Sequence, residues 1–271
     1  MKMMIDYQDI CQKVVEIAKN AGAFIRQERE AFSINSIEFK GKNDLVSYVD
    51  KTVENQIIAG LEPLIAGAGF IAEENKDTHI SDTYNWIIDP LDGTTNFIHG
   101  IPAYAVSIAL KYLDEIVIGV VYEIGKSECF YAWKDSSAYL DGKIIQVSEN
   151  KKVADTLMAT GFPYYDFTRK DTYMELFGDL IQNCHGLRRI GAASVDLVYT
   201  ACGRFDGYFE YNLKPWDIAA GMFIVERAGG KVFDFKGGKD MLKDCDIIAT
   251  NAHISEELIG IIKKYFAKYY N

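Results

Sequence analysis

Cysteine and proline are scarce in this 271-residue sequence. The 5 cysteines lie far apart and form no CxxC pair, so the sequence predicts neither a disulfide framework nor a zinc site. There are also only 5 prolines, and no Pro/Gly/Ser-rich linker or internal repeat divides the chain. We therefore expect one domain over residues 1–271, in two halves that meet near residue 150, where Lys151 and Lys152 follow a polar stretch.

An excess of positive charge is absent as well. Lys and Arg number 29 against 39 Asp and Glu, which gives a formal net charge of -10. A basic face that could bind nucleic acid therefore has no support in the composition. An acidic protein can still bind phosphates if local cations cancel the repulsion, and a bound metal ion is the simplest source of such charge.

Long hydrophobic runs are missing too. No stretch approaches the roughly 18 to 20 apolar residues that a membrane span requires. The first residues, MKMMIDYQDI, carry an acid early and have no extended apolar core, so they do not resemble a secretory signal. We expect a cytoplasmic protein that does not bind membranes.

The residues that are present predict a packed, layered α/β fold. Hydrophobic residues make up 49% of the chain and charged residues 25%, as in packed globular domains. Apolar residues at three- and four-residue spacing predict helices over 10–25 and 53–65, the second ended by Gly67 and Gly69. Further helices are expected over 173–181, 193–202, 216–228 and 255–269, with Ser255 as the cap of the last.

Short apolar runs predict the strands. In the first half they are GFIAEEN, NWIIDP, YAVSIALKY, EIVIGVVYEI and ECFYAW, and in the second half TLMATGF, FDGYFEY, KVFDF and DIIATN. Each run is short, apolar and bounded by turn residues. Strands that alternate with helices indicate layers of helix and sheet around a common core.

The segment WIIDPLDGTTNFIHG, residues 86–100, is the most informative. An apolar strand leads to Asp89, and Asp92 follows three residues later, so a turn can bring both carboxylates to one side. Gly93 allows the backbone to approach a ligand closely, and the N–H groups of a helix that begins at Thr94 can hold phosphate oxygens. Oxygen ligands of this kind suit Mg²⁺.

Other acids could complete a metal site. They are Asp44, Glu73, Glu74 and Asp217. Each has a simpler interpretation, because an Asp-Gly pair commonly forms a turn, adjacent glutamates commonly lie on the surface, and Asp217 could cap a helix. A phosphatase with an aspartate nucleophile is disfavoured, because haloacid-dehalogenase-like enzymes place their second Asp two positions after the first.

In combination these segments resemble the inositol monophosphatase family, among the lithium-sensitive, Mg²⁺-dependent phosphatases. The first family signature is similar to WIIDPLDGTTNF and the second to WDIAAGMFIVERAGG, residues 216–230. The IAEEN segment and the IGAAS segment at 190–194 match further parts in the same order. The resemblance covers nearly the whole chain and implies a single catalytic domain built as a layered αβαβα sandwich of the inositol monophosphatase and fructose-1,6-bisphosphatase type.

The resemblance also implies roles for individual residues. Two or three Mg²⁺ ions are expected, one held by Glu73, Asp89 and the Leu91 carbonyl, a second by Asp89, Asp92 and Asp217, and a weaker third near Glu73. Gly93 and Thr94 would offer N–H groups to the phosphate. Glu73 and Thr94 would orient the attacking water, with Asp44 bonded to the Thr94 hydroxyl. Asp92, the Ala193 backbone and Glu210 would contact substrate hydroxyls.

The implied activity is hydrolysis of inositol monophosphate or a related small sugar phosphate by metal-activated water, in a homodimer. Within the same fold, the alternative substrate is a bisphosphate or a nucleotide, including fructose 1,6-bisphosphate, 3'-phosphoadenosine 5'-phosphate and NADP. A non-catalytic, metal-responsive binding protein is the alternative of another class. The resemblance gives no reason to expect nucleic acid or membrane as partners.

Overall fold

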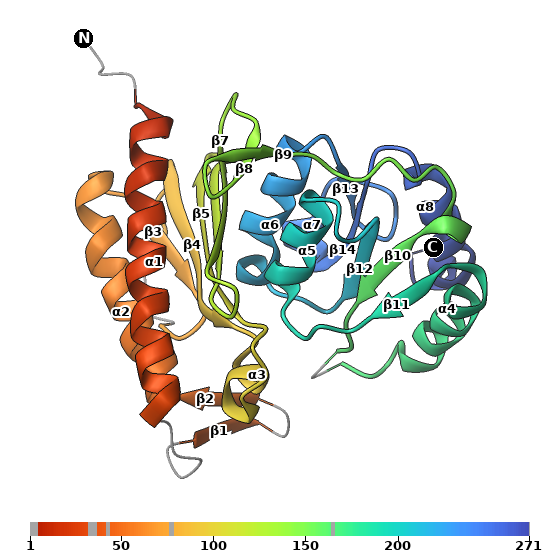
Figure 1. Cartoon of the computed structure of the whole chain (residues 1–271), viewed down its shortest axis with the longest axis horizontal. Helices are drawn as coiled ribbons and strands as arrows, with labels where there is room; N and C mark the ends of the chain where they lie inside the picture. The colour runs from red at the N-terminus through yellow and green to blue at the C-terminus, as the bar shows by residue number, and fades with distance from the viewer. Residues whose placement is uncertain (1–4, 32–36, 42–43, 76–78, 164–165, 271) are drawn as a thin grey trace.

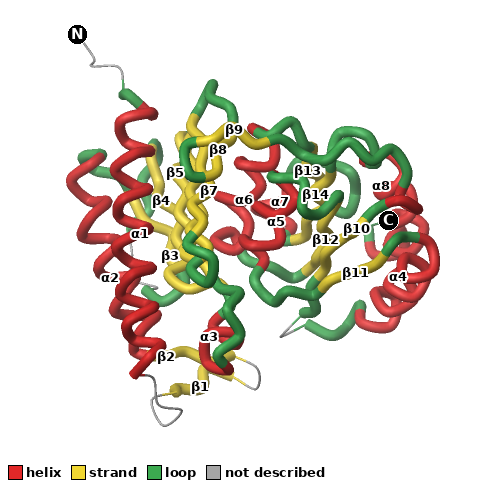
Figure 2. The backbone as a smooth tube through the Cα atoms, in the orientation of Figure 1, coloured by secondary structure: helices red, strands yellow, loops and turns green. Residues whose placement is uncertain are grey.

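The chain folds into five alternating layers of helix and sheet, the αβαβα sandwich that its sequence predicts (Figure 1). A computed structural model describes residues 5–31, 37–41, 44–75, 79–163 and 166–270. In Figure 2 the two sheets stand apart, with helices outside each sheet and between them. From the N-terminal side, the helical layers are α1 (Tyr7–Ala31) with α2 (Tyr48–Leu61), then α5 (Ala193–Ala201) with α6 (Pro215–Arg227), and finally α4 (Lys170–Asn183) with α8 (Ser255–Phe266).

The first sheet has seven strands in sequence order, β3-β4-β5-β6-β7-β8-β9. Its neighbours pair antiparallel except β3 and β4, which are parallel. The five apolar runs of the first half form its first five strands. The strands are β3 (Gly69–Ala72), β4 (Tyr84–Asp92), β5 (Ala105–Tyr112), β6 (Glu115–Glu123), β7 (Glu128–Trp133), β8 (Ala138–Leu140) and β9 (Lys143–Ile145).

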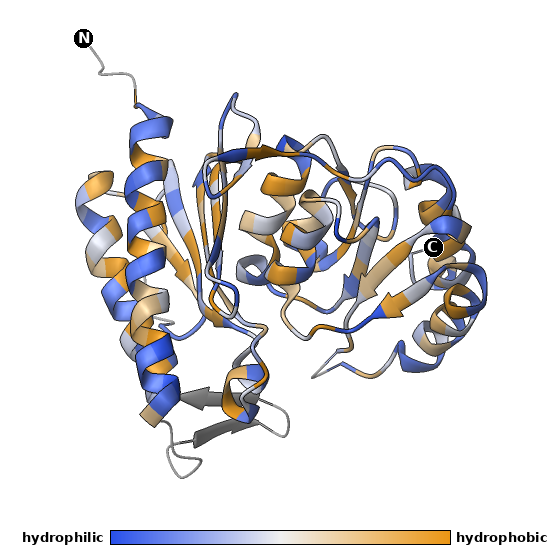
Figure 3. Cartoon of the chain, viewed as in Figure 1, coloured by the Kyte–Doolittle hydropathy of each residue, from blue (hydrophilic) through white to orange (hydrophobic). Residues whose placement is uncertain are grey.

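Helices α1 and α2 cover the outer face of this sheet. Ile10, Val14, Ala18 and Ile25 are buried along one side of α1, which is the face that the three- and four-residue spacing predicts. Figure 3 shows the matching division of α1 into hydrophilic and hydrophobic residues. The second helix ends earlier than predicted: α2 stops at Leu61 and a 3₁₀ turn follows over Glu62–Leu64, because the helix interior does not accommodate the proline in that turn.

The second sheet has five strands in the order β11-β10-β12-β14-β13. Strand β10 pairs parallel with β11 and β12, and β14 pairs antiparallel with β12 and β13. Helices α5 and α6 lie between the two sheets, and every residue of α5 is buried, as expected for a helix packed on all sides. The strands are β10 (Leu157–Thr160), β11 (Gly186–Arg188), β12 (Gly207–Tyr211), β13 (Lys231–Phe233) and β14 (Asp246–Thr250).

Several short elements were not predicted. They are the hairpin of β1 (Ile37–Gly41) and β2 (Asp44–Ser47), the strands β8, β9 and β11, and the helix α7 (Met241–Asp244). Each is too short to develop a periodic pattern. The helix considered at Thr94 is present as the short α3 (Thr94–His99). The predicted cap of the last helix is also wrong, because Ser255 is the first residue of α8 and Ile254 precedes it as the cap.

The connection between the sheets runs from the end of β9 at Ile145 to the start of β10 at Leu157. We propose that the two halves of the domain meet along this connection, near residue 150. Within the residues that the structure describes, no helix is both long enough and apolar enough to span a membrane.

Candidate active site

Strand β4 carries two of the predicted acids into the interior. Asp89 and Asp92 are only 2% and 9% exposed, and the pairing of β4 with β5 is irregular between them. Asp89 Oδ1 accepts a hydrogen bond of 3.0 Å from the Leu91 N–H. The turn at the end of the strand therefore places both carboxylates and the Leu91 peptide in one small region.

Four of the predicted acids, Glu73, Asp89, Asp92 and Asp217, lie close enough there for their charges to shift pKa values within the group. Burial raises the pKa of Asp89 well above its usual value, and the charges of Glu73, Asp92 and Asp217 raise it further. Burial, and then the charge of Asp92, raises the pKa of Asp217 to about 7. Residues from the end of β3, from β4 and from α6 are thus brought together although they are far apart in sequence.

This group of carboxylates has the donor chemistry of a site for hard dications. Among the described residues, no three acidic, His or Cys side chains are placed closely enough to hold one metal ion as they stand. Three oxygens of the group already accept backbone hydrogen bonds: Asp89 Oδ1 from the Leu91 N–H at 3.0 Å, Asp92 Oδ2 from the Ser194 N–H at 2.7 Å, and Asp217 Oδ2 from the Lys214 N–H at 2.7 Å. Mg²⁺ would coordinate the remaining carboxylate oxygens and offset the repulsion between their charges. The chemistry of these side chains therefore fits the ion.

Asp217 also has the simpler role considered for it. It lies in the first turn of α6 and accepts the N–H of Lys214, the residue before the helix. A carboxylate at this position satisfies one of the free N–H groups of the helix start. Capping therefore fixes Asp217 at the acidic group, so the two interpretations are compatible.

Thr94 contacts an aspartate that the sequence did not predict. Its hydroxyl lies 3.2 Å from Asp50 Oδ1 and 3.0 Å from the Leu91 carbonyl oxygen. Asp50 is on α2 and is 1% exposed. The prediction named Asp44 as this partner; the Asp44 backbone belongs to β2, and its side chain lies outside the described residues. Among the side chains that the structure describes, the carboxylate at the Thr94 hydroxyl is that of Asp50.

Gly93 forms the sharp turn between β4 and α3. Its φ of +88° is a left-handed conformation, and a Cβ at this position would lie 3.0 Å from the Ala103 carbonyl oxygen. Helix α3 begins directly after it at Thr94. The first N–H groups of a helix have no carbonyl partner within the helix, so this turn presents donors beside the acidic group.

A second wall of the site comes from the other half of the chain. Asp92 accepts from the N–H and the hydroxyl of Ser194, in the first turn of α5. On β12, Glu210 is buried and accepts from the Tyr208 hydroxyl at 2.6 Å. Burial raises the pKa of Glu210 to about 8, while Tyr208 and the Arg189 charge oppose that shift. Glu210 thus faces the same region as Asp92.

Asp196 is a further acid that the sequence did not reveal. It lies on α5, is 1% exposed, and its Oδ1 has no hydrogen-bond partner among the described residues. Burial raises its pKa well above the usual value, and the charges of Glu210 and Asp92 add to this effect. One sequence signal was available: an aspartate in an otherwise apolar helix, between Val195 and Leu197.

The raised pKa values predict an unusual pH dependence of stability without metal. A carboxyl group whose pKa rises from 3.8 to about 7 on folding stabilises the fold below its unfolded pKa, and this contribution is lost as the pH rises through the folded value. For the partly buried Asp217 it amounts to at most about 4 kcal/mol. We expect thermal melts in EDTA to show a Tm that falls from about pH 4 to about pH 7.

Asp217→Asn keeps the acceptor for Lys214 and removes the titrating group, so its melts in EDTA should depend less on pH. Mg²⁺ should also reduce the dependence in the original protein by favouring the charged carboxylates. An Asp217→Asn variant with an unchanged pH dependence would contradict the assignment.

Known proteins match this chain over nearly its whole length. The inositol monophosphatase family matches residues 6–266. An inositol-1-monophosphatase of Mesorhizobium japonicum is 36% identical over 252 residues, which are 93% of this chain and 95% of that protein. The protein of Escherichia coli named Nus factor SuhB is 38% identical over 247 residues, which are 91% and 92% of the two chains.

Solved structures share the same fold. An extragenic suppressor protein suhB from Bartonella henselae superposes with a TM-score of 0.89 at 37% identity, covering 94% of this chain and 99% of that one. The inositol monophosphatase of Anabaena gives a TM-score of 0.82 at 32% identity, with 95% and 96% coverage.

Proposed function

Because the chain belongs to the inositol monophosphatase family, we propose that it is a Mg²⁺-dependent phosphomonoesterase for inositol monophosphate or a related small sugar phosphate. The observation that carries this proposal is the group of Glu73, Asp89, Asp92 and Asp217, whose charges act on one another in the interior. A protein with a net charge of -10 needs such a group to bind a phosphate ester, since the cations that the group holds offset the repulsion.

Glu73, Asp89 and the Leu91 carbonyl would hold one ion, and Asp89, Asp92 and Asp217 a second, with a weaker third near Glu73. Mg²⁺ bound there would make hydroxide available near neutral pH and would neutralise charge on the phosphoryl oxygens. Because Asp89, Leu91 and Asp92 belong to β4, the strand holds these ligands in fixed positions.

Thr94 and Glu73 would orient the attacking water in this proposal. The Thr94 hydroxyl has a buried carboxylate at hydrogen-bond distance, that of Asp50. A hydroxyl that donates to a carboxylate keeps its own lone pairs available to accept the proton of a water. We therefore propose that Asp50 orients the Thr94 hydroxyl. The predicted contact of Asp44 with that hydroxyl stays a prediction, because the Asp44 side chain lies outside the described residues.

One side of the site would bind the phosphate of the substrate, and the other side would bind the alcohol. Gly93 and Thr94 lie where the backbone N–H groups of α3 can donate to the phosphate. Asp92, the Ala193 backbone and Glu210 would contact hydroxyls of the alcohol. Asp92 links the two walls, because its carboxylate lies beside Asp89 and also accepts from Ser194.

A metal-responsive binding protein without turnover is the second candidate. In its favour, relatives at 37% and 38% identity carry the name Nus factor SuhB and are not named for a phosphatase. Against direct binding of nucleic acid stands the net charge of -10, which repels polyanions. The full set of acids around Thr94 favours retained catalysis.

Phosphate release from a panel of substrates tests the proposal. The panel includes inositol 1-phosphate, fructose 1,6-bisphosphate, 3'-phosphoadenosine 5'-phosphate and NADP, each with Mg²⁺, with EDTA, and with Mg²⁺ plus Li⁺. We expect release from inositol 1-phosphate that needs Mg²⁺ and falls with Li⁺. Release from the bisphosphates or nucleotides alone would shift the assignment to the alternative substrates. No release from any compound would favour the binding protein.

The setting of the enzyme is also part of the proposal. We propose a cytoplasmic homodimer that binds neither membranes nor nucleic acid. Light scattering at the mass of one 30.5 kDa chain would remove the dimer from this description.

A further inference from the structure

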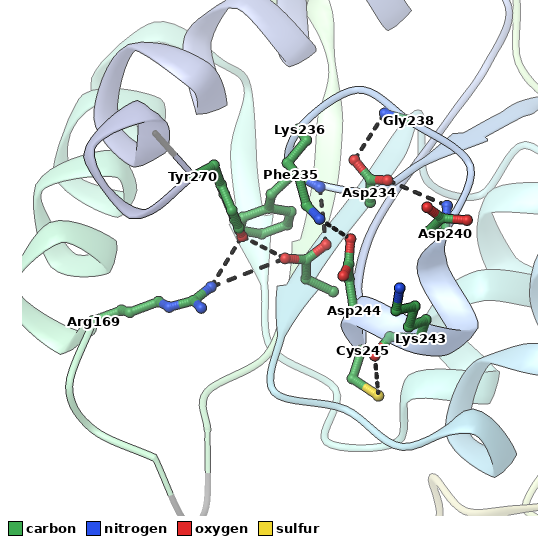
Figure 4. Close-up of polar contacts among 11 residues, drawn as sticks. Arg169, Asp234, Phe235, Lys236, Gly238, Asp240, Lys243, Asp244, Cys245 and Tyr270 are labelled. Carbon is green, nitrogen blue, oxygen red and sulfur yellow. Dashed lines mark hydrogen bonds and ion pairs between the residues drawn. The ribbon is translucent and has the colours of Figure 1, made fainter.

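The segment after α8 contacts the start of α4 through a network of hydrogen bonds and charges around the buried Asp246 (Figure 4). The Tyr270 hydroxyl donates to Asp246 Oδ2 at 2.5 Å and accepts from Arg169 Nη1 at 2.9 Å. Asp246 Oδ2 also lies 4.0 Å from the Arg169 guanidinium. Since Asp246 is 1% exposed and accepts the Phe235 N–H as well, the aspartate is a fixed anchor, and Tyr270 connects Arg169 to it.

Aromatic rings enclose the guanidinium. Its central carbon lies 5.3 Å from the ring centroids of both Tyr269 and Tyr270, and 6.0 Å from that of Tyr211. A second hydroxyl contact, 3.0 Å between Tyr269 and Thr172, joins the same segment to α4. Cations over aromatic faces and hydrogen bonds to a buried carboxylate hold a side chain more firmly than exposed ion pairs do.

Arg169 is the cap residue of α4, so the network fixes the point where the chain enters that helix. The chain arrives there from β10 through Gly161 and Phe162, and later through Phe167. An apolar groove of about 360 Å³ lies at this place. It is lined by Phe162, Pro163, Phe167, Lys170, Tyr173, Met174 and Tyr211.

The chain that leaves β10 also borders the proposed active site. Gly161 packs directly on Glu210, since a Cβ at Gly161 would lie 1.8 Å from Glu210 Oε2. The Phe162 ring centroid is 5.9 Å from the Arg189 guanidinium carbon, and the Arg189 charge lowers the pKa of both Asp92 and Glu210. Gly161 and Phe162 therefore border the side of the proposed site that would contact the alcohol.

We propose that Tyr270, Arg169 and Asp246 are positioning residues that hold the Gly161–Phe162 wall against Glu210 and so determine how tightly the alcohol part of the substrate binds. The inference rests on the proposed phosphatase function. None of the three touches the acids proposed for the metal ions or the Thr94 hydroxyl in the described contacts, so the network acts on recognition of the alcohol and not on the attack at phosphorus.

Tyr270→Phe tests the inference, because it removes the bridging hydroxyl and keeps the ring. With inositol 1-phosphate we expect KM to rise about three- to tenfold and kcat to stay within about twofold. Ethyl phosphate, whose alcohol is too small to reach Glu210, should show no change. Arg169→Gln disrupts the same network at the start of α4 and should change KM and kcat in the same way.

Tyr265→Phe is the matched control. Tyr265 lies in α8, just before the turn that carries Tyr270, and its hydroxyl donates to Asp179 near the other end of α4 at 2.7 Å. This variant should leave KM unchanged for both substrates. Equal effects of Tyr270→Phe and Tyr265→Phe, or an equal loss with inositol 1-phosphate and ethyl phosphate, would overturn the proposal.

Hydrogen exchange tests the network without any turnover. Tyr270→Phe should speed amide exchange in peptides that contain residues 166–173, whereas Tyr265→Phe should not. If the original protein hydrolyses no ester, the proposed function fails, but this exchange result still decides whether the network holds the start of α4. Unchanged exchange in both Tyr270→Phe and Arg169→Gln would reject the network itself.

Discussion

Asp89→Asn is expected to lower kcat by about three orders of magnitude while raising the Tm of the metal-free protein. Asp89 is the acid on which Glu73, Asp92 and Asp217 all act, and it is assigned to both main ions. The amide keeps the shape of the side chain and removes a charge that a dication requires. Without metal, the same change relieves repulsion between buried carboxylates, so the fold gains stability.

The two results together separate this role from a structural one. Asp206→Asn is the control, since Asp206 is also buried but accepts from Asn150, Ser148 and the Leu157 N–H within the fold. That variant should lose Tm and keep its kcat at temperatures where it is folded. Phosphate release and thermal melts in EDTA measure both quantities. An Asp89→Asn protein that is folded and nearly fully active would reject the metal assignment.

Asp50→Asn should lower kcat by about a hundredfold or more and leave KM within about threefold. The Thr94 hydroxyl contacts Asp50 and the Leu91 carbonyl, and an amide at residue 50 can present an N–H where the carboxylate accepted. The hydroxyl would then lose its orientation toward the water. Circular dichroism and a thermal melt would establish that the variant is folded.

Asp44→Asn provides the comparison with the original assignment. The two aspartates are six residues apart, in β2 and α2. If Asp50 is the partner of Thr94, Asp44→Asn should keep kcat within about threefold. The opposite outcome, a large loss from Asp44→Asn and little from Asp50→Asn, would support the Asp44 assignment and reject the one to Asp50.

Asp50 could have been found from the helix pattern. On α2 the buried positions are Val49, Asp50, Val53, Glu54, Ile57 and Leu61, so two acids lie on the apolar face. A carboxylate on such a face is rare unless it has a partner or a function. The predicted helix begins at residue 53, whereas α2 begins at Tyr48, so Asp50 lay outside the prediction.

The main helices and strands were predictable because helical spacing and short apolar runs are visible in the sequence. Strand β4 and helix α1 are clear examples, since each buries a continuous face. Strand β11 and helix α3 have three and six residues, and their positions depend on tertiary contacts such as those of Asn96 with the Ala103 and Ile190 carbonyls. No local pattern records contacts of that kind.

The arrangement of the site across both sheets has a consequence for how relatives can diverge. In our proposal the phosphoryl chemistry depends on Asp50, Glu73 and the end of β4, whereas the alcohol meets β12 and the first turn of α5. Asp217 is the one ligand supplied from the later part. Mutational drift in the second half can therefore exchange one alcohol for another while the hydrolytic machinery is inherited unchanged.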